Sequence, residues 1–197
     1  MGSYFGLSGA DFGIHGYLRA RDGTFTVFDP PGSVDTVPLG INPEGTITGW
    51  YINLADCCAF HGFVRARNGT FTTFDPFGSI QTNPSSINPE AAITGFYLDS
   101  SFIEHGFLRA KNGILITIDP PGSTFNQPSG INPAGAIAGD SCDATGCHLF
   151  LRARNGTFTT FDPPGSIETI AGPNPAGAIT GNYRDASFIS HGFLWSP

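Results

Sequence analysis

Charged side chains are scarce in this sequence, and positive charge is the scarcer sign. Of the 197 residues 13% are charged, with nine Lys or Arg against sixteen Asp or Glu, and Lys111 is the single lysine. The formal net charge is −7 and the isoelectric point is near 4.9. A surface with this balance repels the phosphate backbone, so we expect no nucleic-acid partner.

Long hydrophobic runs are also absent. No stretch approaches the roughly 18 apolar residues that mark a membrane-spanning helix. The first residues, Met1 to Tyr4, contain neither the basic region nor the apolar region of a secretion signal. We therefore expect no membrane span and no export signal within this chain.

The familiar catalytic motifs are missing as well. The sequence contains no Gly-x-Ser-x-Gly elbow, no His-Glu-x-x-His, no phosphate-binding loop of the Walker type and no dinucleotide fingerprint. We expect a protein that is not an enzyme and that uses no cofactor and no metal. An enzyme built on other residues stays open as an alternative.

Glycine, proline and aromatic residues are abundant. The chain has 27 Gly, 16 Pro, 18 Phe, 5 Tyr and 2 Trp, and 40% of it is hydrophobic. This glycine content is nearly twice the ordinary one and disfavours long helices, while the aromatic residues supply a core. The composition excludes a disordered chain and favours short strands joined by turns.

A unit of about 44 residues is repeated along the whole chain. One phrase begins at each histidine, and a second phrase lies between the copies: INPEG at 41, INPEA at 87, INPAG at 131 and PNPAG at 173. A fixed period of this length indicates a repeat architecture. We expect one domain over 1–197, with units at about 2–40, 41–86, 87–130, 131–172 and 173–197. The histidines are His15, His61, His105, His148 and His191.

Each unit predicts four short antiparallel strands. Asn42 to Gly45 has the residues of a type I turn between the first two strands. A loop of seven to ten residues precedes the His-Gly-Phe-Leu-Arg strand, and Asn68-Gly69 predicts a two-residue hairpin before the fourth strand. The Asp-Pro-Pro-Gly-Ser phrase then ends pairing, because proline donates no hydrogen bond to a neighbouring strand.

Four strands per 44-residue unit predict an all-β fold, a β-propeller of five blades. The chain contains eighteen such strands: blades 41–77, 87–121 and 131–163 are complete, the first blade lacks its inner strand and the last its outer strand. We expect the two terminal blades to be neighbours around a central axis. Small residues should line that axis on the inner strands: Gly40, Ser86, Gly130 and Gly172.

The phrases HGFLRA, GTFTTFDPPGS and INPAGAITG give the chain a family resemblance. It resembles the bacterial extracellular repeat proteins named for a His-Ala-Phe (HAF) motif, whose arrays are similar to β-propellers. The match covers residues 2 to 197, although Gly or Leu replaces Ala after every His. The resemblance implies an extracellular or periplasmic location and carries over no catalytic residue.

Hairpin register places each histidine beside the aspartate that ends its fourth strand. We interpret these pairs as structural clasps within each blade. A ring of metal ligands or catalytic bases, and direct ligand contact, are the alternatives. The expected pairs are His15 with Asp29, His61 with Asp75, His105 with Asp119, and His148 with Asp162.

A second polar series follows the second strand, beside aromatic residues. An Asx turn that caps the loop is the first interpretation, and a sugar contact is the alternative. Calcium is disfavoured, because no clustered acidic run supplies its six to eight oxygens. The groove after Gly139 should bind most weakly, since Asp140 and Ser141 replace the aromatics. The candidate ligand residues are Trp50, Tyr51, Asn53, Phe96, Tyr97, Asp99, Tyr183 and Asp185, and Asp143 belongs to the same series.

Cationic pairs and cysteines complete the candidates. The pairs on the third strands predict ladders or ion pairs with neighbouring blades, with a carboxylated ligand as the alternative. Cys142 and Cys147 flank a short loop and predict a disulfide, which favours an oxidising compartment. Cys57 and Cys58 need not be oxidised. The cationic pairs are Arg19 with Arg21, Arg65 with Arg67, Arg109 with Lys111, and Arg152 with Arg154.

The sequence is compatible with three functions. The first is a lectin-like binding module that holds a glycan or cell-surface ligand in grooves between blades, on the face with the long loops. The second is a structural or adhesive scaffold, and the third is a hydrolase or lyase that uses the His and Asp series. The open blade edges also offer a route to self-association.

Overall fold

The computed structural model describes residues 1–6, 12–56, 59–173 and 178–195. Within these ranges the chain forms eighteen strands and one short 3-10 helix, η2 (Leu54–Asp56). Among the described residues no helix is long and apolar enough to cross a membrane. The predictions for Cys57 and Cys58, and for the last Asn-Pro turn at 174–177, lie outside the described residues.

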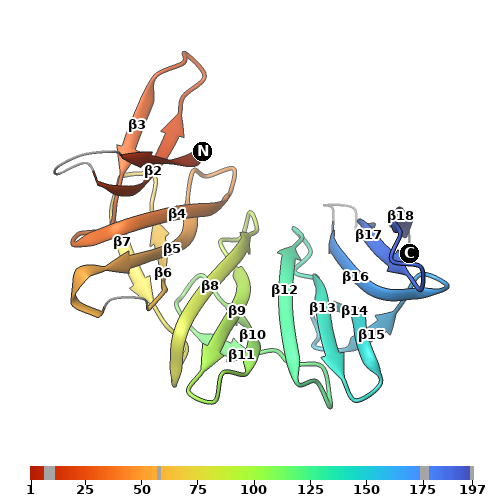
Figure 1. The fold of residues 1–197 in the computed structure, drawn as a ribbon. Helices are drawn as coiled ribbons and strands as arrows, with labels where there is room; N and C mark the ends of the chain where they lie inside the picture. Colours follow the sequence, from red (N-terminus) through yellow and green to blue (C-terminus); the bar gives the residue numbers. More distant parts are fainter. Residues whose placement is uncertain (7–11, 57–58, 174–177, 196–197) are drawn as a thin grey trace.

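Three complete blades form the centre of the molecule (Figure 1). In each blade four consecutive strands pair antiparallel in sequence order. The first contains β4 (Ser33–Ile41), β5 (Ile47–Asn53), β6 (His61–Arg65) and β7 (Phe71–Phe74). The second contains β8 (Ser79–Ile87), β9 (Ile93–Asp99), β10 (Glu104–Arg109) and β11 (Leu115–Thr117), and the third contains β12 (Phe125–Ile131), β13 (Ile137–Asp143), β14 (Gly146–Arg152) and β15 (Phe158–Phe161).

The two terminal blades have three strands each. The N-terminal one contains β1 (Gly2–Gly6), β2 (Gly13–Arg19) and β3 (Phe25–Phe28), and a single parallel bridge between Ile14 and Asp35 joins it to β4. The C-terminal one contains β16 (Ser166–Pro173), β17 (Ile179–Asp185) and β18 (Ser190–Trp195). The predicted strand tally is confirmed, including the missing inner strand of the first blade and outer strand of the last.

The blades form an open arc rather than a closed ring. The inner strands follow one another in space, since β4 contacts β8, β8 contacts β12 and β12 contacts β16. Figure 1 shows the N-terminal and C-terminal blades far apart, and no described strand of one pairs with the other. The expected contact between the terminal blades is therefore wrong, because β2 attaches the N-terminal blade to β4 instead.

The turns between first and second strands follow the prediction. Gly45 N–H donates to the Asn42 carbonyl at 3.0 Å, and the Asn42 side chain accepts the Thr46 N–H at 2.9 Å. Gly45 has φ of +82°, which glycine tolerates best. The Asn42 amide also donates to the Asn88 carbonyl of the next blade, and Asn88 donates to the Asn132 carbonyl, both at 3.3 Å.

The hairpin between third and fourth strands is longer than predicted. Ala66 N–H donates to the Thr70 carbonyl and Gly69 N–H to the Ala66 carbonyl, so the loop has three residues, Arg67 to Gly69, rather than two. A two-residue loop at Asn68-Gly69 would put Phe63 opposite Phe74. The observed register differs by one position, so that Phe63 lies opposite Thr73 and Gly62 lies opposite Phe74. This shift places His61 directly opposite Asp75.

The core lies within and between the blades. Phe63, Phe107 and Phe150, one from each third strand, are completely buried. Each packs against a phenylalanine of a fourth strand, as Phe107 does on Phe74 of the preceding blade with ring centroids 5.9 Å apart. Close approach of inner strands also requires a small residue at Gly40, where a Cβ atom would lie 3.0 Å from Ile87.

Candidate ligand-binding groove

All four predicted His–Asp contacts are present. In each, the histidine Nδ1 lies within hydrogen-bond distance of the aspartate Oδ2, and the antiparallel register of third and fourth strands brings the pair together. The distances are 2.9 Å for His15–Asp29, 2.8 Å for His61–Asp75, 2.7 Å for His105–Asp119 and 2.6 Å for His148–Asp162.

The second carboxylate series forms Asx turns. Asp99 Oδ1 accepts the N–H groups of Ser101 and Ile103 at 2.8 and 2.9 Å, and Asp185 does the same for Ser187 and Ile189. Asn53 accepts the N–H of Ala55 at 2.9 Å. Hydrogen bonds from the Ile103 and Ser101 backbones lower the pKa of Asp99, so this group is ionised at neutral pH.

These loop carboxylates also reach the histidines, which the sequence analysis missed. Asp99 Oδ2 lies 3.5 Å from His105 Nε2, and Asp185 Oδ2 lies 2.9 Å from His191 Nε2. The signal was available in the strand register. His105 lies opposite Tyr97, so Asp99, two residues further on, follows on the same side of the sheet.

A histidine that lies between two carboxylates is stabilised in its protonated, positively charged form. Although burial opposes charge on His105, hydrogen bonds and the charges of Asp119 and Asp99 raise its pKa above the ordinary value. The hydrogen bond to Asp162 raises the pKa of His148, with a smaller contribution from Asp143.

Two predicted ligand residues are part of the interior. Tyr51 and Tyr97 are each only 8% exposed, and their rings lie against His61 and His105 with centroids 5.3 and 5.2 Å apart. The Tyr97 hydroxyl is 3.1 Å from Thr117 Oγ1. The expectation that these tyrosines offer a surface to sugars is wrong, because each one covers the histidine of its own blade.

The other predicted aromatics lie elsewhere. Trp50 stacks on Phe60 with centroids 4.6 Å apart. Tyr183 stacks on His191 at 5.0 Å and is partly exposed. Phe96 lines a groove of about 300 Å³ together with Leu39 and Pro128. In the part of the chain that the structure describes, these aromatics therefore have different surroundings and do not share one repeated arrangement.

Ser141 changes this arrangement in the third complete blade. Its backbone lies opposite His148, where Tyr51 and Tyr97 lie opposite His61 and His105. Because serine has no ring to place over the histidine, His148 lines a groove of about 680 Å³. The loss of aromatics at Asp140 and Ser141 was expected to give the weakest binding groove. In the structure the missing ring leaves space for the groove beside His148. The groove is lined by Pro120, Pro121, Ser123, Ser141, Asp143, Thr145, His148, Gly156, Phe158, Thr160, Phe161 and Asp162.

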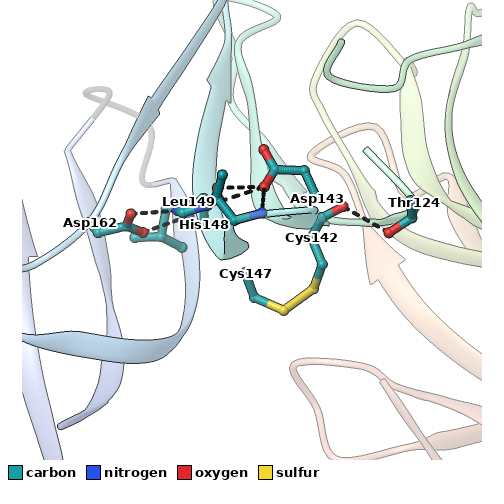
Figure 2. A network of polar contacts seen from close by, with 8 residues as sticks. Thr124, Cys142, Asp143, Cys147, His148, Leu149 and Asp162 are labelled. Atoms are coloured by element: carbon teal, nitrogen blue, oxygen red, sulfur yellow. Dashed lines mark hydrogen bonds and ion pairs between the residues drawn. A yellow bond between two sulfur atoms is a disulfide. The ribbon is translucent and has the colours of Figure 1, made fainter. Parts of the chain in front are cut away.

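The polar groups of the groove are held in place. Figure 2 shows Asp162 on one side of His148 and Asp143 on the other. Thr145 Oγ1 lies 2.9 Å from His148 Nε2 and 2.6 Å from Asp143 Oδ1. The predicted Cys142–Cys147 disulfide is present at the end of the same hairpin and ties its two strands together. Hydrogen bonds from Thr145 lower the pKa of Asp143.

Several arginines make contacts between neighbouring blades. Arg65 and Arg109 lie over the rings of Phe28 and Phe74 of the preceding blades, with guanidinium carbons 4.8 and 4.9 Å from the centroids. Arg154 makes an ion pair of 3.4 Å with Glu90 of the neighbouring blade. Among the described residues no group of three or more His, Cys, Asp or Glu is arranged to hold a metal ion.

Comparison with one solved structure supports the fold. A protein provisionally described as TolB, from Agrobacterium tumefaciens, is 10% identical, with a TM-score of 0.58 over 92% of this chain and 73% of that one. A second structure, provisionally described as a gluconolactonase, is 13% identical, with a TM-score of 0.49 over 92% of this chain and 70% of that one. No protein-family model and no curated protein matches the sequence.

Proposed function

We propose that the protein is a non-enzymatic, extracellular binding module that holds a carbohydrate in the groove beside His148. The observation that carries this proposal is the groove itself: hydrogen-bonding groups of Thr145, Thr160 and Asp162 lie beside the apolar surfaces of Phe158 and Pro121. Sugars are recognised by such a combination, since their hydroxyls need polar partners and their C–H faces need apolar ones.

The state of His148 favours binding over catalysis. Its Nδ1 contacts Asp162 and its Nε2 contacts Thr145, so both ring nitrogens already have partners within the protein. A general base needs a nitrogen within hydrogen-bond reach of the reacting proton. The arrangement supports a fixed set of donors and acceptors, and the repeat resemblance to the HAF family supports the extracellular location.

The decisive test closes the groove with the residue that the other blades use. Ser141→Tyr should place a ring over His148 and its hydroxyl near Thr160, which occupies the position of Thr117, the partner of Tyr97. Wild type and Ser141→Tyr are compared on a glycan array, and hits are measured by calorimetry. We expect at least a tenfold loss of affinity with unchanged thermal stability.

A matched control keeps the test specific. Thr160→Ala should weaken binding several-fold, because Thr160 lines the groove, whereas Thr73→Ala removes the equivalent exposed threonine of the first complete blade and should change nothing. Binding that survives Ser141→Tyr, or an array without any hit, refutes the proposal. Turnover of a bound sugar would instead support the hydrolase or lyase alternative.

A further inference from the structure

The charges of this acidic protein are separated between the two ends of its hairpins. Eight of the nine basic side chains lie at or beside the turns that join third and fourth strands. Three acidic side chains, Asp22, Glu44 and Glu90, lie in the tight turns at the same end of the strands. The eight are Arg19, Arg21, Arg65, Arg67, Arg109, Lys111, Arg152 and Arg154.

The opposite ends of the same strands are acidic. Arg184 is the one basic side chain among the described residues there. The Ile103 backbone hydrogen bond lowers the pKa of Asp99, the Thr145 side-chain hydrogen bond lowers the pKa of Asp143, and both carboxylates remain ionised. The described acidic residues at this end are Asp29, Asp35, Asp75, Asp99, Glu104, Asp119, Asp143, Asp162 and Asp185.

One exposed cation per complete blade is left without a structural task in the core. Arg65 and Arg109 are held over phenylalanine rings, but the second cation of each pair is exposed. Even the ion pair of Arg154 with Glu90 leaves their side chains 69% and 56% exposed. The exposed set is Arg67, Lys111 and Arg154.

A matching set of carboxylates lies at the other end. Asp75, Asp119 and Asp162 close the fourth strands, with side chains 38%, 26% and 33% exposed. Within one hairpin Arg65 pairs with Phe71 at the turn end and Gly62 pairs with Phe74 at the other end, so cation and carboxylate lie at opposite ends.

Both sets follow the same repeat. Arg67 and Lys111 are 44 residues apart, as are Asp75 and Asp119; Lys111 and Arg154 are 43 apart, as are Asp119 and Asp162. The rotation from one blade to the next therefore arranges cations and carboxylates alike. A second copy displaced along the axis of the arc would bring its carboxylates opposite all three cations together.

We propose that this charged turn face binds the carboxylate face of a second copy, so that the molecules stack head to tail. A single exposed ion pair contributes about 0–1 kcal/mol, but a repeated set engages several pairs at once. The contact is heterologous, with different surfaces on the two partners, and permits further copies to add. Salt should weaken it, because the screening length falls from about 30 Å at 0.01 M to about 8 Å at 0.15 M.

The first test is sedimentation velocity of the full chain at low and physiological salt. We expect concentration-dependent association at low salt that is lost as salt rises. A variant with Arg67→Gln, Lys111→Gln and Arg154→Gln should stay monomeric. A control with Thr26→Glu, Thr72→Glu and Thr159→Glu lowers the net charge equally, on exposed outer strands, and should still associate.

A mixing experiment identifies the two faces. A second variant with Asp75→Asn, Asp119→Asn and Asp162→Asn keeps an acceptor oxygen for each histidine and should also be monomeric alone. Mixed with the Gln variant it should form a dimer, since each supplies the face that the other lacks. If it does not fold, the Gln variant and its charge control decide alone.

Several results would overturn the stack. Wild type that is monomeric at low salt, or a Gln variant that associates like wild type, contradicts it directly. Association that survives the face variants but is lost in Leu194→Pro places the contact at the open edge of β18 instead. Binding of a soluble polyanion to the turn face without self-association would make that face an anion site.

Discussion

The blade β8–β11 and the blade β12–β15 share one design and differ at one decisive position. In β8–β11 the ring of Tyr97 covers His105 and bonds Thr117, whereas in β12–β15 Ser141 leaves His148 facing a groove of about 680 Å³. The strand pairing around the two histidines is the same. A candidate site can therefore arise where one residue departs from the repeat.

The electrostatic surroundings of the two histidines hardly differ. Each has a fourth-strand aspartate at Nδ1 and a loop aspartate near Nε2, and the pKa of each is raised. The side chains of His105 and His148 are equally exposed, at 26% each, and what differs between the blades is the groove that adjoins His148. This difference separates the structural role of the His–Asp pair from the role of the groove.

Exchanging the two residues tests that separation and carries the largest expected effect. Tyr97→Ser removes a buried ring and should lower the free energy of unfolding by about 3 kcal/mol, through lost burial and an incompletely filled cavity. Ser141→Tyr should change stability by less than about 1 kcal/mol, because its ring enters space that is already open. Urea denaturation of both variants measures the contrast.

Equal effects in the two blades would break the comparison. If Ser141→Tyr destabilises as strongly as Tyr97→Ser, the groove is a packed feature that does not admit a ring. The double variant supplies a further check, since the two sites lie in different blades and their effects should add within about 0.5 kcal/mol.

The disulfide gives the second largest contrast. It closes the β13–β14 hairpin, whereas the β9–β10 hairpin is closed by the Asx turn of Asp99 and by backbone hydrogen bonds between Asp99 and Ile103 and between Phe102 and Asp99. Replacing Cys142 and Cys147 by Ser should lower stability by about 2 kcal/mol, because the closed loop is short. The free energy of binding a groove ligand should decrease by more than the free energy of unfolding does, because the bridge fixes the strands that carry Thr145 and His148. Calorimetry measures the change in binding and urea denaturation measures the change in stability. An unchanged affinity would contradict a role of the disulfide in positioning the groove residues.

The strands of the fold could be predicted because the same sequence phrases recur in every repeat unit. The His phrase, the Asn-Pro turn and the Pro-Pro crossover recur together, so eighteen strands and four His–Asp pairs follow from one unit. Ring closure was not predictable in the same way. It depends on how β2 meets β4, a single bridge at Ile14 that no local pattern encodes.

The groove was missed for a different reason. The recurring aromatics were predicted to contact a ligand, but Tyr51 and Tyr97, which lie opposite His61 and His105, are buried core residues. The informative signal was the exception, Ser141, where the repeat loses its ring. The predicted hairpin register was also one position off, because the loop has three residues, Arg67 to Gly69, rather than two.

The pH dependence of the two histidines gives a third contrast. Raised pKa values mean that the His–Asp pairs stabilise the fold fully below the unfolded histidine pKa of about 6.5, and that this stability is lost as pH rises through the folded values. We therefore expect the free energy of unfolding to decrease between pH 6 and 8. Asp162→Asn should lower the pKa of His148 and leave that of His105 unchanged, as followed by NMR titration; a shift of both would show that the blades are coupled.

The smallest expected effect concerns the ion pair between the two blades. Arg154 and Glu90 lie 3.4 Å apart but are largely exposed, so solvent screens their attraction and Glu90→Gln should change stability by less than about 0.5 kcal/mol. The same substitution removes one of the few carboxylates on the turn face. If the exposed cations there bind another molecule, it should strengthen low-salt association while leaving the denaturation midpoint unchanged. Weaker association in Glu90→Gln would show that the pair positions Arg154, and a clearly lowered midpoint would show that the contact holds the two blades together.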